Sequence, residues 1–89
     1  MPMNQLDPNQ ASQVVLSAPQ VLTASSVIQG YTYDASSYQL VVWFKGKKKS
    51  VYRYYNVFPG AVSDVFDRGG SIGSNASKML KGYQKQKLR

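Results

Sequence analysis

The sequence predicts a small α+β domain: a three-stranded antiparallel β-meander, with a four-stranded sheet as the alternative, followed by two short helices packed on one face. Three observations predict this class. Residues 38–55 place runs of β-branched and aromatic residues on both sides of a glycine–lysine turn, which is typical of a β-hairpin. Residues 25–34 form a similar run just before it. Apolar residues recur at helical spacing in the C-terminal third.

The first 24 residues are predicted to form a flexible arm, and residues 25–89 the folded domain. The arm is rich in Gln, Asn, Ser and Pro, and its three prolines break any long helix. The alternative is that the short apolar-containing pieces at residues 13–16 and 20–22 form an edge strand or an arm that reaches a neighbouring subunit. The 89 residues are enough for one small domain.

Residues 25–34 are predicted to be the first strand, interrupted by Gly30. A glycine inside a strand favours a bulge or the close approach of another backbone segment. Asp34 is predicted to open a turn at residues 34–37, because its side chain can hydrogen-bond to nearby backbone groups. The hairpin of residues 38–55 then completes the meander.

Side chains alternate between the two faces of a strand, so the hairpin is predicted to have an inward and an outward row. The inward row is large and apolar: Tyr38, Leu40, Val42 and Phe44, with Tyr52 and Tyr54 from the return strand. The outward row mixes aromatic and cationic residues with others: Gln39, Val41, Trp43, Lys45, Val51, Arg53 and Tyr55. We expect the two inward tyrosines to pack in the core with their hydroxyls hydrogen-bonded at its rim.

Pro59 is predicted to begin the first helix, because its missing N–H costs nothing in a first turn. Val62, Val65 and Phe66 share one side of this helix, and a pair of glycines ends it.

The second helix is predicted at about residues 75–81, or onward to the terminus, with Ser74 or Asn75 as its N-cap. Gly82 weakens it. Three side chains on one side are expected to be buried and three lysines to project from another: Met79, Leu80 and Tyr83, and Lys78, Lys81 and Lys85.

The composition argues against catalysis. The chain has no cysteine, histidine or glutamate, and its only acidic residues are four aspartates. The usual acid–base and metal-binding side chains are therefore missing, so we expect no enzymatic activity, no metal and no cofactor. No apolar run is long enough to span a bilayer and no signal peptide begins the chain, so we expect a soluble, cytoplasmic protein.

The net charge of +7 is unevenly distributed. All eleven Lys and Arg residues lie between Lys45 and Arg89, where only Asp64 and Asp67 oppose them. This half therefore carries +9 and the first half −2. Such asymmetry favours a polyanionic partner, whether nucleic acid or an anionic membrane surface, over a merely solubilising surface. We expect nucleic acid, and no membrane.

The hairpin supplies most of the candidate binding residues. Its turn concentrates four lysines in five residues and would bind phosphates without reading bases; a solvated turn tip is the alternative. In the outward row, Trp43 and Tyr55 would stack on bases beside Arg53, which would hold phosphate. For this row the alternative is a second buried face, covered by the N-terminal segment or by another subunit. The predicted nucleic-acid-binding residues are Trp43, Lys45, Lys47, Lys48, Lys49, Arg53, Tyr55, Lys78, Lys81 and Lys85.

A set of spaced residues extends from the first predicted strand to the second helix. They are Tyr33-Asp34, Leu40, Val42, Phe44, the YxY of Tyr52-Arg53-Tyr54, Val57, Pro59, Ser71, Gly73, Leu80, Lys81 and Tyr83. Together they resemble the KTSC domain, which is named for its place at the C-terminus of some lysyl-tRNA synthetases and also occurs as a stand-alone protein in bacteria and phages. The resemblance covers residues 25–83 and implies a compact α+β domain that binds RNA or other nucleic acid.

The sequence departs from this family pattern in three places. The hairpin turn is longer by two residues and richer in lysine, which strengthens the expectation of anion binding. Phe58 separates Val57 from Pro59, where the family usually has Val-Pro. Ala76-Ser77 replace the usual aromatic–Asn pair of the last helix, which weakens any transfer of function from that helix.

We therefore expect a non-enzymatic protein that binds single-stranded DNA or RNA with little sequence specificity, as an accessory of replication or transcription. The resemblance alone implies that it is phage-encoded and acts in the host cytoplasm. The alternative is an interaction module that regulates a nucleic-acid enzyme, with RNA polymerase or replication proteins as partners; a purely structural oligomer is a further one. Exposed aromatics and a small core also favour a homo-oligomer.

Overall fold

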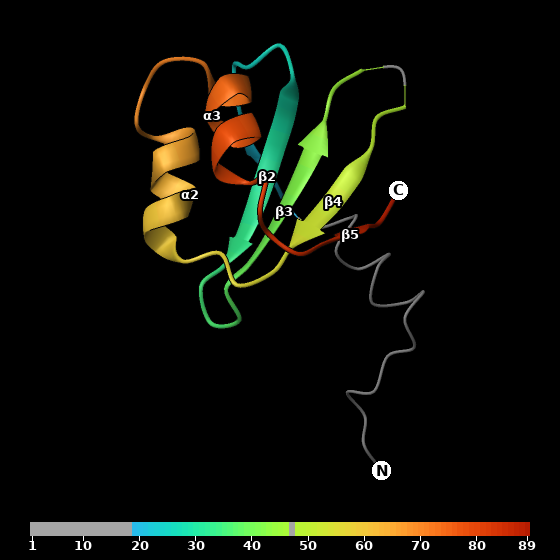
Figure 1. Ribbon diagram of the computed structural model, residues 1–89. Coiled ribbons are helices and arrows are strands. Elements are labelled where there is room, and N and C mark those ends of the chain that lie inside the picture. The colour runs from blue at the N-terminus through green and yellow to red at the C-terminus, as the bar shows by residue number, and fades with distance from the viewer. Residues whose placement is uncertain (1–18, 47) are drawn as a thin grey trace.

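The computed structural model describes residues 19–46 and 48–89, and within these ranges the strands form one antiparallel sheet in chain order (Figure 1). The strands are β1 (Val21–Leu22), β2 (Ile28–Asp34), β3 (Gln39–Phe44), β4 (Val51–Tyr54) and β5 (Lys85–Lys87). Helices α2 (Pro59–Phe66) and α3 (Ile72–Met79) come between β4 and β5 in the chain and pack on one face of the sheet. The predicted α+β class is confirmed.

The described part of the sheet has five strands where three or four were expected. The predicted meander is β2–β3–β4, and a strand is added at each edge. β1 falls inside the predicted arm, so the edge-strand alternative holds for Val21 and Leu22; residues 1–18 lie outside the described residues. β5 lies where the second helix was expected to continue.

Helix α3 begins and ends earlier than expected. Gly69 and Gly70 have positive φ angles of 95° and 74°, and they turn the chain just before Ser71. Ser71 is then the N-cap, because its Oγ accepts a hydrogen bond from the backbone N–H of Ser74 at 3.2 Å. The predicted cap at Ser74 or Asn75 is therefore wrong. The helix ends with Leu80 as its C-cap, which leaves Gly82 in a turn that leads to β5.

The expected bulge at Gly30 is confirmed. The register between β2 and β3 shifts between Ile28 and Gly30, which lies opposite Trp43. β1 passes so close that a Cβ atom on Gly30 would lie 2.8 Å from the Val21 carbonyl oxygen and 2.6 Å from Gln20 Oε1. The glycine is thus required for β1 to pair with β2.

The turn between β2 and β3 also has the predicted chemistry. The Asp34 carboxylate accepts hydrogen bonds from the Ser36 hydroxyl at 2.6 Å, the Ser36 backbone N–H at 3.0 Å and the Ser37 hydroxyl at 2.8 Å. The Ser36 and Ser37 hydroxyls, in that order, hold the pKa of this carboxyl below its ordinary value of 3.8.

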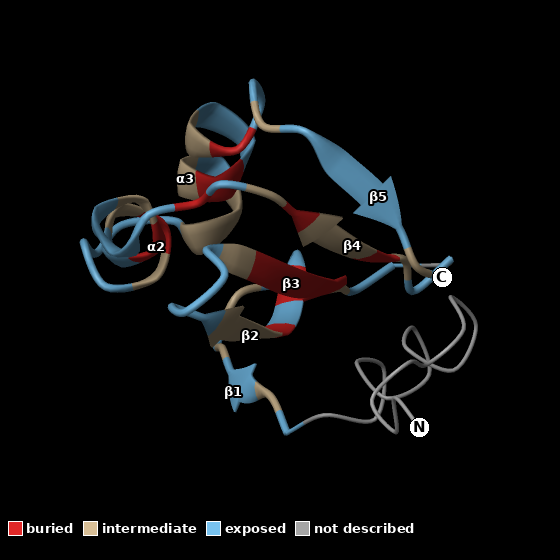
Figure 2. Cartoon of the chain, turned by 90° about the horizontal axis from the view of Figure 1, so that it is seen from below, coloured by how far each residue is buried: buried red, intermediate tan, exposed pale blue. Residues whose placement is uncertain are grey.

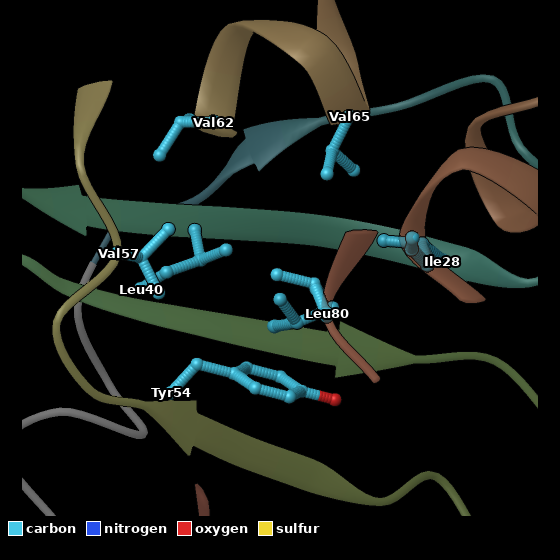
Figure 3. Close-up of a cluster of buried hydrophobic side chains, with 9 residues drawn as sticks. Ile28, Leu40, Tyr54, Val57, Val62, Val65 and Leu80 are labelled. Atoms are coloured by element: carbon cyan, nitrogen blue, oxygen red, sulfur yellow. The ribbon is translucent and has the colours of Figure 1, made fainter. Parts of the chain in front are cut away.

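The main core lies between the two helices and the sheet (Figure 3). Leu40 and Val42 are fully buried there, as the inward row predicts, and Tyr54 is 6% exposed. Phe44 and Tyr52 are only partly buried at its border. The helices and the sheet contribute the buried members together: Ile28, Leu40, Val42, Tyr54, Val57, Val62, Val65, Ala76 and Leu80.

Tyr38 is the one member of the inward row that the structure places elsewhere. It precedes β3, has a φ of 56° and is exposed. This left-handed conformation takes it out of the strand's alternation, so its ring packs edge-on against Phe58 with the ring centroids 4.7 Å apart. The prediction that Tyr38 is a core residue is therefore wrong.

We expect Gly30→Ala to lower the free energy of unfolding by about 1–3 kcal/mol, because the new methyl group overlaps the β1 backbone. Gly60→Ala is the matched control: it lies in the first turn of α2 with nothing within 4 Å of the added atom, and should be neutral or slightly stabilising. Urea denaturation of both variants makes the comparison. Equal midpoints would contradict the close approach of β1.

Candidate nucleic-acid interface

The outward row of the hairpin is a second buried cluster. Val41, Trp43 and Val51 lie on the face of the sheet away from the helices, and Leu88, just after β5, packs against them. Trp43 is 2% exposed, so its indole ring has no face open to a base. The expectation of an exposed Trp43 is wrong, and the buried alternative holds, with part of the cover coming from the C-terminal segment. Figure 2 shows most of β3 buried and β5 exposed at the edge of the sheet, with β4 between them.

The pairing of β5 with β4 brings the following residue, Leu88, onto this cluster. Gln86 lies opposite Arg53 and Lys85 opposite Tyr54. Beyond the paired residues, the Leu88 backbone N–H donates to the Val51 carbonyl oxygen at 2.7 Å. Alternation then places Leu88 on the Trp43 face and the β5 lysines on the helix-bearing face.

Arg53 and Tyr55 are half-buried. Within the described residues the Arg53 Nε atom is shielded from solvent and has no hydrogen-bond partner, while the Tyr55 hydroxyl donates to Gln86 Oε1 at 2.7 Å. Both residues therefore lie beside the buried cluster, not in a row with open aromatic faces.

The hairpin turn is exposed, as expected. Lys45 is anchored at its start: its backbone N–H donates to the Val27 carbonyl oxygen and its Nζ donates to the Ser25 carbonyl oxygen, each at 2.7 Å. Lys48 and Lys49 are exposed, and Lys49 has a φ of 45°. The Lys49 backbone N–H donates to the Gly46 carbonyl oxygen at 3.2 Å. Lys47 lies outside the described residues.

The three C-terminal lysines have different positions. Lys78 is exposed on α3, and Lys81 follows the C-cap of that helix. Lys85 is on β5, not on a helix, and its Nζ lies 5.0 Å from the centre of the Tyr52 ring. This is a cation–π geometry, which fixes an ammonium group over an aromatic face.

The sequence analysis did not identify two aromatic residues of the helix-bearing face as candidate binding residues. Phe44 and Tyr52 pack edge-on with their ring centroids 6.0 Å apart, and both are half-buried where the main core meets solvent. Alternation placed them correctly with the core. It does not show that they lie at its border, because that depends on how far the helices extend across the sheet. Lys87 lies opposite Tyr52 and was also missed.

We call this region the lysine–aromatic surface. It consists of Phe44 and Tyr52 with the lysines of the turn and of β5: Lys45, Lys48, Lys49, Lys85 and Lys87. Lys85 and Lys87 share the helix-bearing face with these rings, whereas Lys45, Lys48 and Lys49 lie in the turn that follows Phe44. The sequence analysis placed the binding aromatic residues on the opposite face.

A pocket of about 440 Å³ adjoins the lysine–aromatic surface, between α3 and the helix-bearing face of β3 and β4. Its lining is mostly apolar, with two lysines at one side: Val27, Phe44, Tyr54, Gly73, Ala76, Ser77, Leu80, Lys81 and Lys85. Burial, with a smaller contribution from Tyr52, raises the pKa of the Tyr54 hydroxyl. That hydroxyl therefore remains a hydrogen-bond donor at neutral pH.

Two further classes of site are absent from the described residues. No group of three or more His, Cys, Asp or Glu side chains in residues 19–46 and 48–89 is placed to bind a metal ion. No helix in these ranges has the length and apolar character needed to cross a membrane.

Comparison with solved structures gives the fold a name. The crystal structure of a KTSC domain protein from Yersinia pestis superposes with a TM-score of 0.68 and 24% sequence identity, over 78% of this chain and 94% of that one. The resemblance found in the sequence is thus matched in three dimensions, and the fold is that of a KTSC domain. No family model and no curated protein matches the sequence.

We expect Trp43→Ala to lower the free energy of unfolding by about 3–5 kcal/mol, because it removes a buried indole ring. Tyr55→Ala is the control on the same face, and its half-buried ring should cost less. Circular dichroism during chemical denaturation measures both without relying on tryptophan fluorescence. A Trp43→Ala variant as stable as the wild type would contradict the burial of this face.

Proposed function

We propose that this domain with the KTSC fold is a non-enzymatic protein that binds single-stranded DNA or RNA with little sequence specificity. The observation that supports the proposal is the lysine–aromatic surface, in which half-buried rings lie among exposed ammonium groups. A function as an accessory of replication or transcription, in a phage-infected host cytoplasm, remains part of the same proposal.

The lysines supply the affinity that does not depend on sequence. A protein that neutralises phosphates with Lys side chains releases condensed counterions, whatever the bases are. Lys48 and Lys49 extend from the turn, while Lys85 and Lys87 lie on the neighbouring edge strand. A nucleic-acid strand that runs from the turn to β5 would meet lysines at both ends of the lysine–aromatic surface.

The aromatic rings account for the preference for single strands. Every base has a π-face, so stacking on a ring is tolerant of sequence, but it requires a base that is not already stacked inside a duplex. Tyr52 is the ring best suited to this role, because it is half-buried and has the Lys85 ammonium over it. A base that stacks on this ring would displace the ammonium group, which would then hold the adjoining phosphate. Phe44 meets it edge-on and would keep the ring in place.

A protein-interaction module that regulates an enzyme such as RNA polymerase is the second candidate, and a different surface favours it. Tyr38 and Phe58 are 42% and 59% exposed, and pack against each other. Exposed aromatic residues of this kind are typical anchors of protein interfaces. A homo-oligomer remains a prediction, which light scattering tests as a mass above the 9.9 kDa chain.

Replacement of Lys48 and Lys49 by Gln should weaken binding to every single strand alike. The plot of log K against log salt should become shallower by about 0.7 for each lost phosphate contact. Fluorescence polarisation with labelled oligonucleotides at several salt concentrations measures both quantities. Arg68→Gln, at an exposed site after α2, should leave the slope unchanged. If the double variant has the wild-type affinity and slope, the turn does not contact phosphate.

Tyr52→Leu should cost about 1–3 kcal/mol in single-strand binding, because it keeps an apolar side chain but removes the ring. Stacking releases no counterions, so the salt slope should stay near that of the wild type. Duplex binding should fall less, since paired bases keep their faces buried. Tyr55→Leu, on the opposite face, is the matched control and should bind normally. Equal losses in both tyrosine variants would reject Tyr52 as a specific stacking platform.

A further inference from the structure

The pocket beside α3 has features that the proposed strand-binding surface does not require. Phe44 and Tyr54 line it from the sheet, and we call these two residues its floor; Ala76 and Leu80 line it from α3 and the C-cap of that helix. Ser77 lines it from the exposed side of α3. A volume of about 440 Å³ lies in the range of pockets that hold small molecules.

Two residues of the pocket lining, Gly73 and Val27, are in tight contact. A Cβ atom on Gly73 would lie 3.0 Å from Cγ2 of Val27, so the first turn of α3 rests directly on the segment before β2. The Val27 carbonyl in turn accepts a hydrogen bond from the Lys45 backbone N–H. The pocket and the lysine turn are therefore parts of one connected structure.

The charged residues of the pocket lining are both lysines. Lys81 and Lys85 line the pocket and are exposed, while the remaining lining is uncharged. Lys85 is also the residue that lies over the Tyr52 ring, so it belongs both to the pocket and to the lysine–aromatic surface. An occupant suited to this lining has a flat apolar body and one compact anionic group.

We propose that the pocket binds a nucleotide that carries a phosphomonoester, with the base on the Phe44–Tyr54 floor and the phosphate between Lys81 and Lys85. This inference rests on the proposed function and specifies which part of a strand is bound. A phosphomonoester carries about −1.5 to −2 charges at neutral pH, and two ammonium groups match it better than they match the single charge of an internal phosphodiester. The terminal nucleotide of a strand and a free nucleoside monophosphate share this chemistry.

The first experiment measures the affinity of the wild-type chain for a short oligonucleotide with a 5′-phosphate, with a 3′-phosphate, or with neither. We expect one terminal phosphate to tighten binding by roughly fivefold or more, because it adds a contact that internal phosphates do not make. If all three strands bind equally, the pocket proposal is overturned while strand binding itself stands. If no strand binds, the proposed function fails.

Variants then locate the effect. Ser77→Phe fills the mouth of the pocket, and Lys81→Gln removes one of its cations; each should abolish the preference for a terminal phosphate. Ser74→Phe, an exposed site on the same helix outside the pocket lining, is the control for helix α3. Melting curves verify that every variant is folded. A preference that survives both pocket variants places the terminal phosphate elsewhere and overturns the proposal.

The second experiment separates a strand end from a free nucleotide. Amide chemical shifts are followed during titration with AMP, with adenosine and with inorganic phosphate. Saturable shifts at Gly73 and Ser77 with AMP alone support the pocket even if long strands do not bind, and the proposed function would then fail by itself. If inorganic phosphate produces the same shifts, the site binds an anion only. If AMP produces no shift but the oligonucleotides show the terminal-phosphate preference, the pocket binds only the end of a strand.

Discussion

The hairpin of β3 and β4 is apolar on both faces, and this constraint determines most of the structure. Leu40 and Val42 point to the helices, whereas Val41 and Trp43 point the other way, and all four are buried. A sheet with one solvated face would leave about half of this apolar surface in water. The chain meets the requirement with α2 and α3 on one side and with the C-terminal Leu88 on the other.

That solution also determines where the positive charge lies. To bring Leu88 onto the Trp43 cluster, the C-terminal segment must run along β4 as an edge strand. Alternation then places Lys85 and Lys87 on the opposite face, with Lys87 opposite Tyr52 and the Lys85 ammonium over its ring. The position of these two lysines therefore follows from the burial of the second face of the sheet. An edge strand made of lysine and glutamine also discourages pairing with other chains.

Much of the fold could be predicted from the sequence, because its signals are local. The alternation in β3 and β4, the glycine bulge in β2, the Asp34 turn and Pro59 at the start of α2 each depend on neighbouring residues. Strand β5 could not be predicted in this way. Three polar residues after Gly82 have no strand pattern of their own, and they form a strand only because β4 offers a free edge.

The candidate site could be predicted only in part, because only some of its signals are local in the sequence. The lysines were identified from their number and crowding, which need no fold. The choice between Trp43 and Tyr52 as the accessible aromatic required knowledge of which face is covered, and by what. A row that mixes Trp43 with Arg53 and Lys45 has the pattern of an exposed surface, yet the hydrophobic members of that row are buried in a cluster of their own.

Strand β5 and the residue after it place side chains on both faces of the sheet, and this couples the two faces thermodynamically. Lys85 lies over Tyr52 on one face, while Leu88 packs on the Trp43 cluster of the other. Any anion that engages Lys85 favours the docked strand, and docking of the strand is what buries Leu88. By reciprocity, tighter packing at Leu88 raises the anion affinity to the extent that it increases the docked fraction of the strand. The two faces of this small sheet are thus energetically coupled through a strand only three residues long.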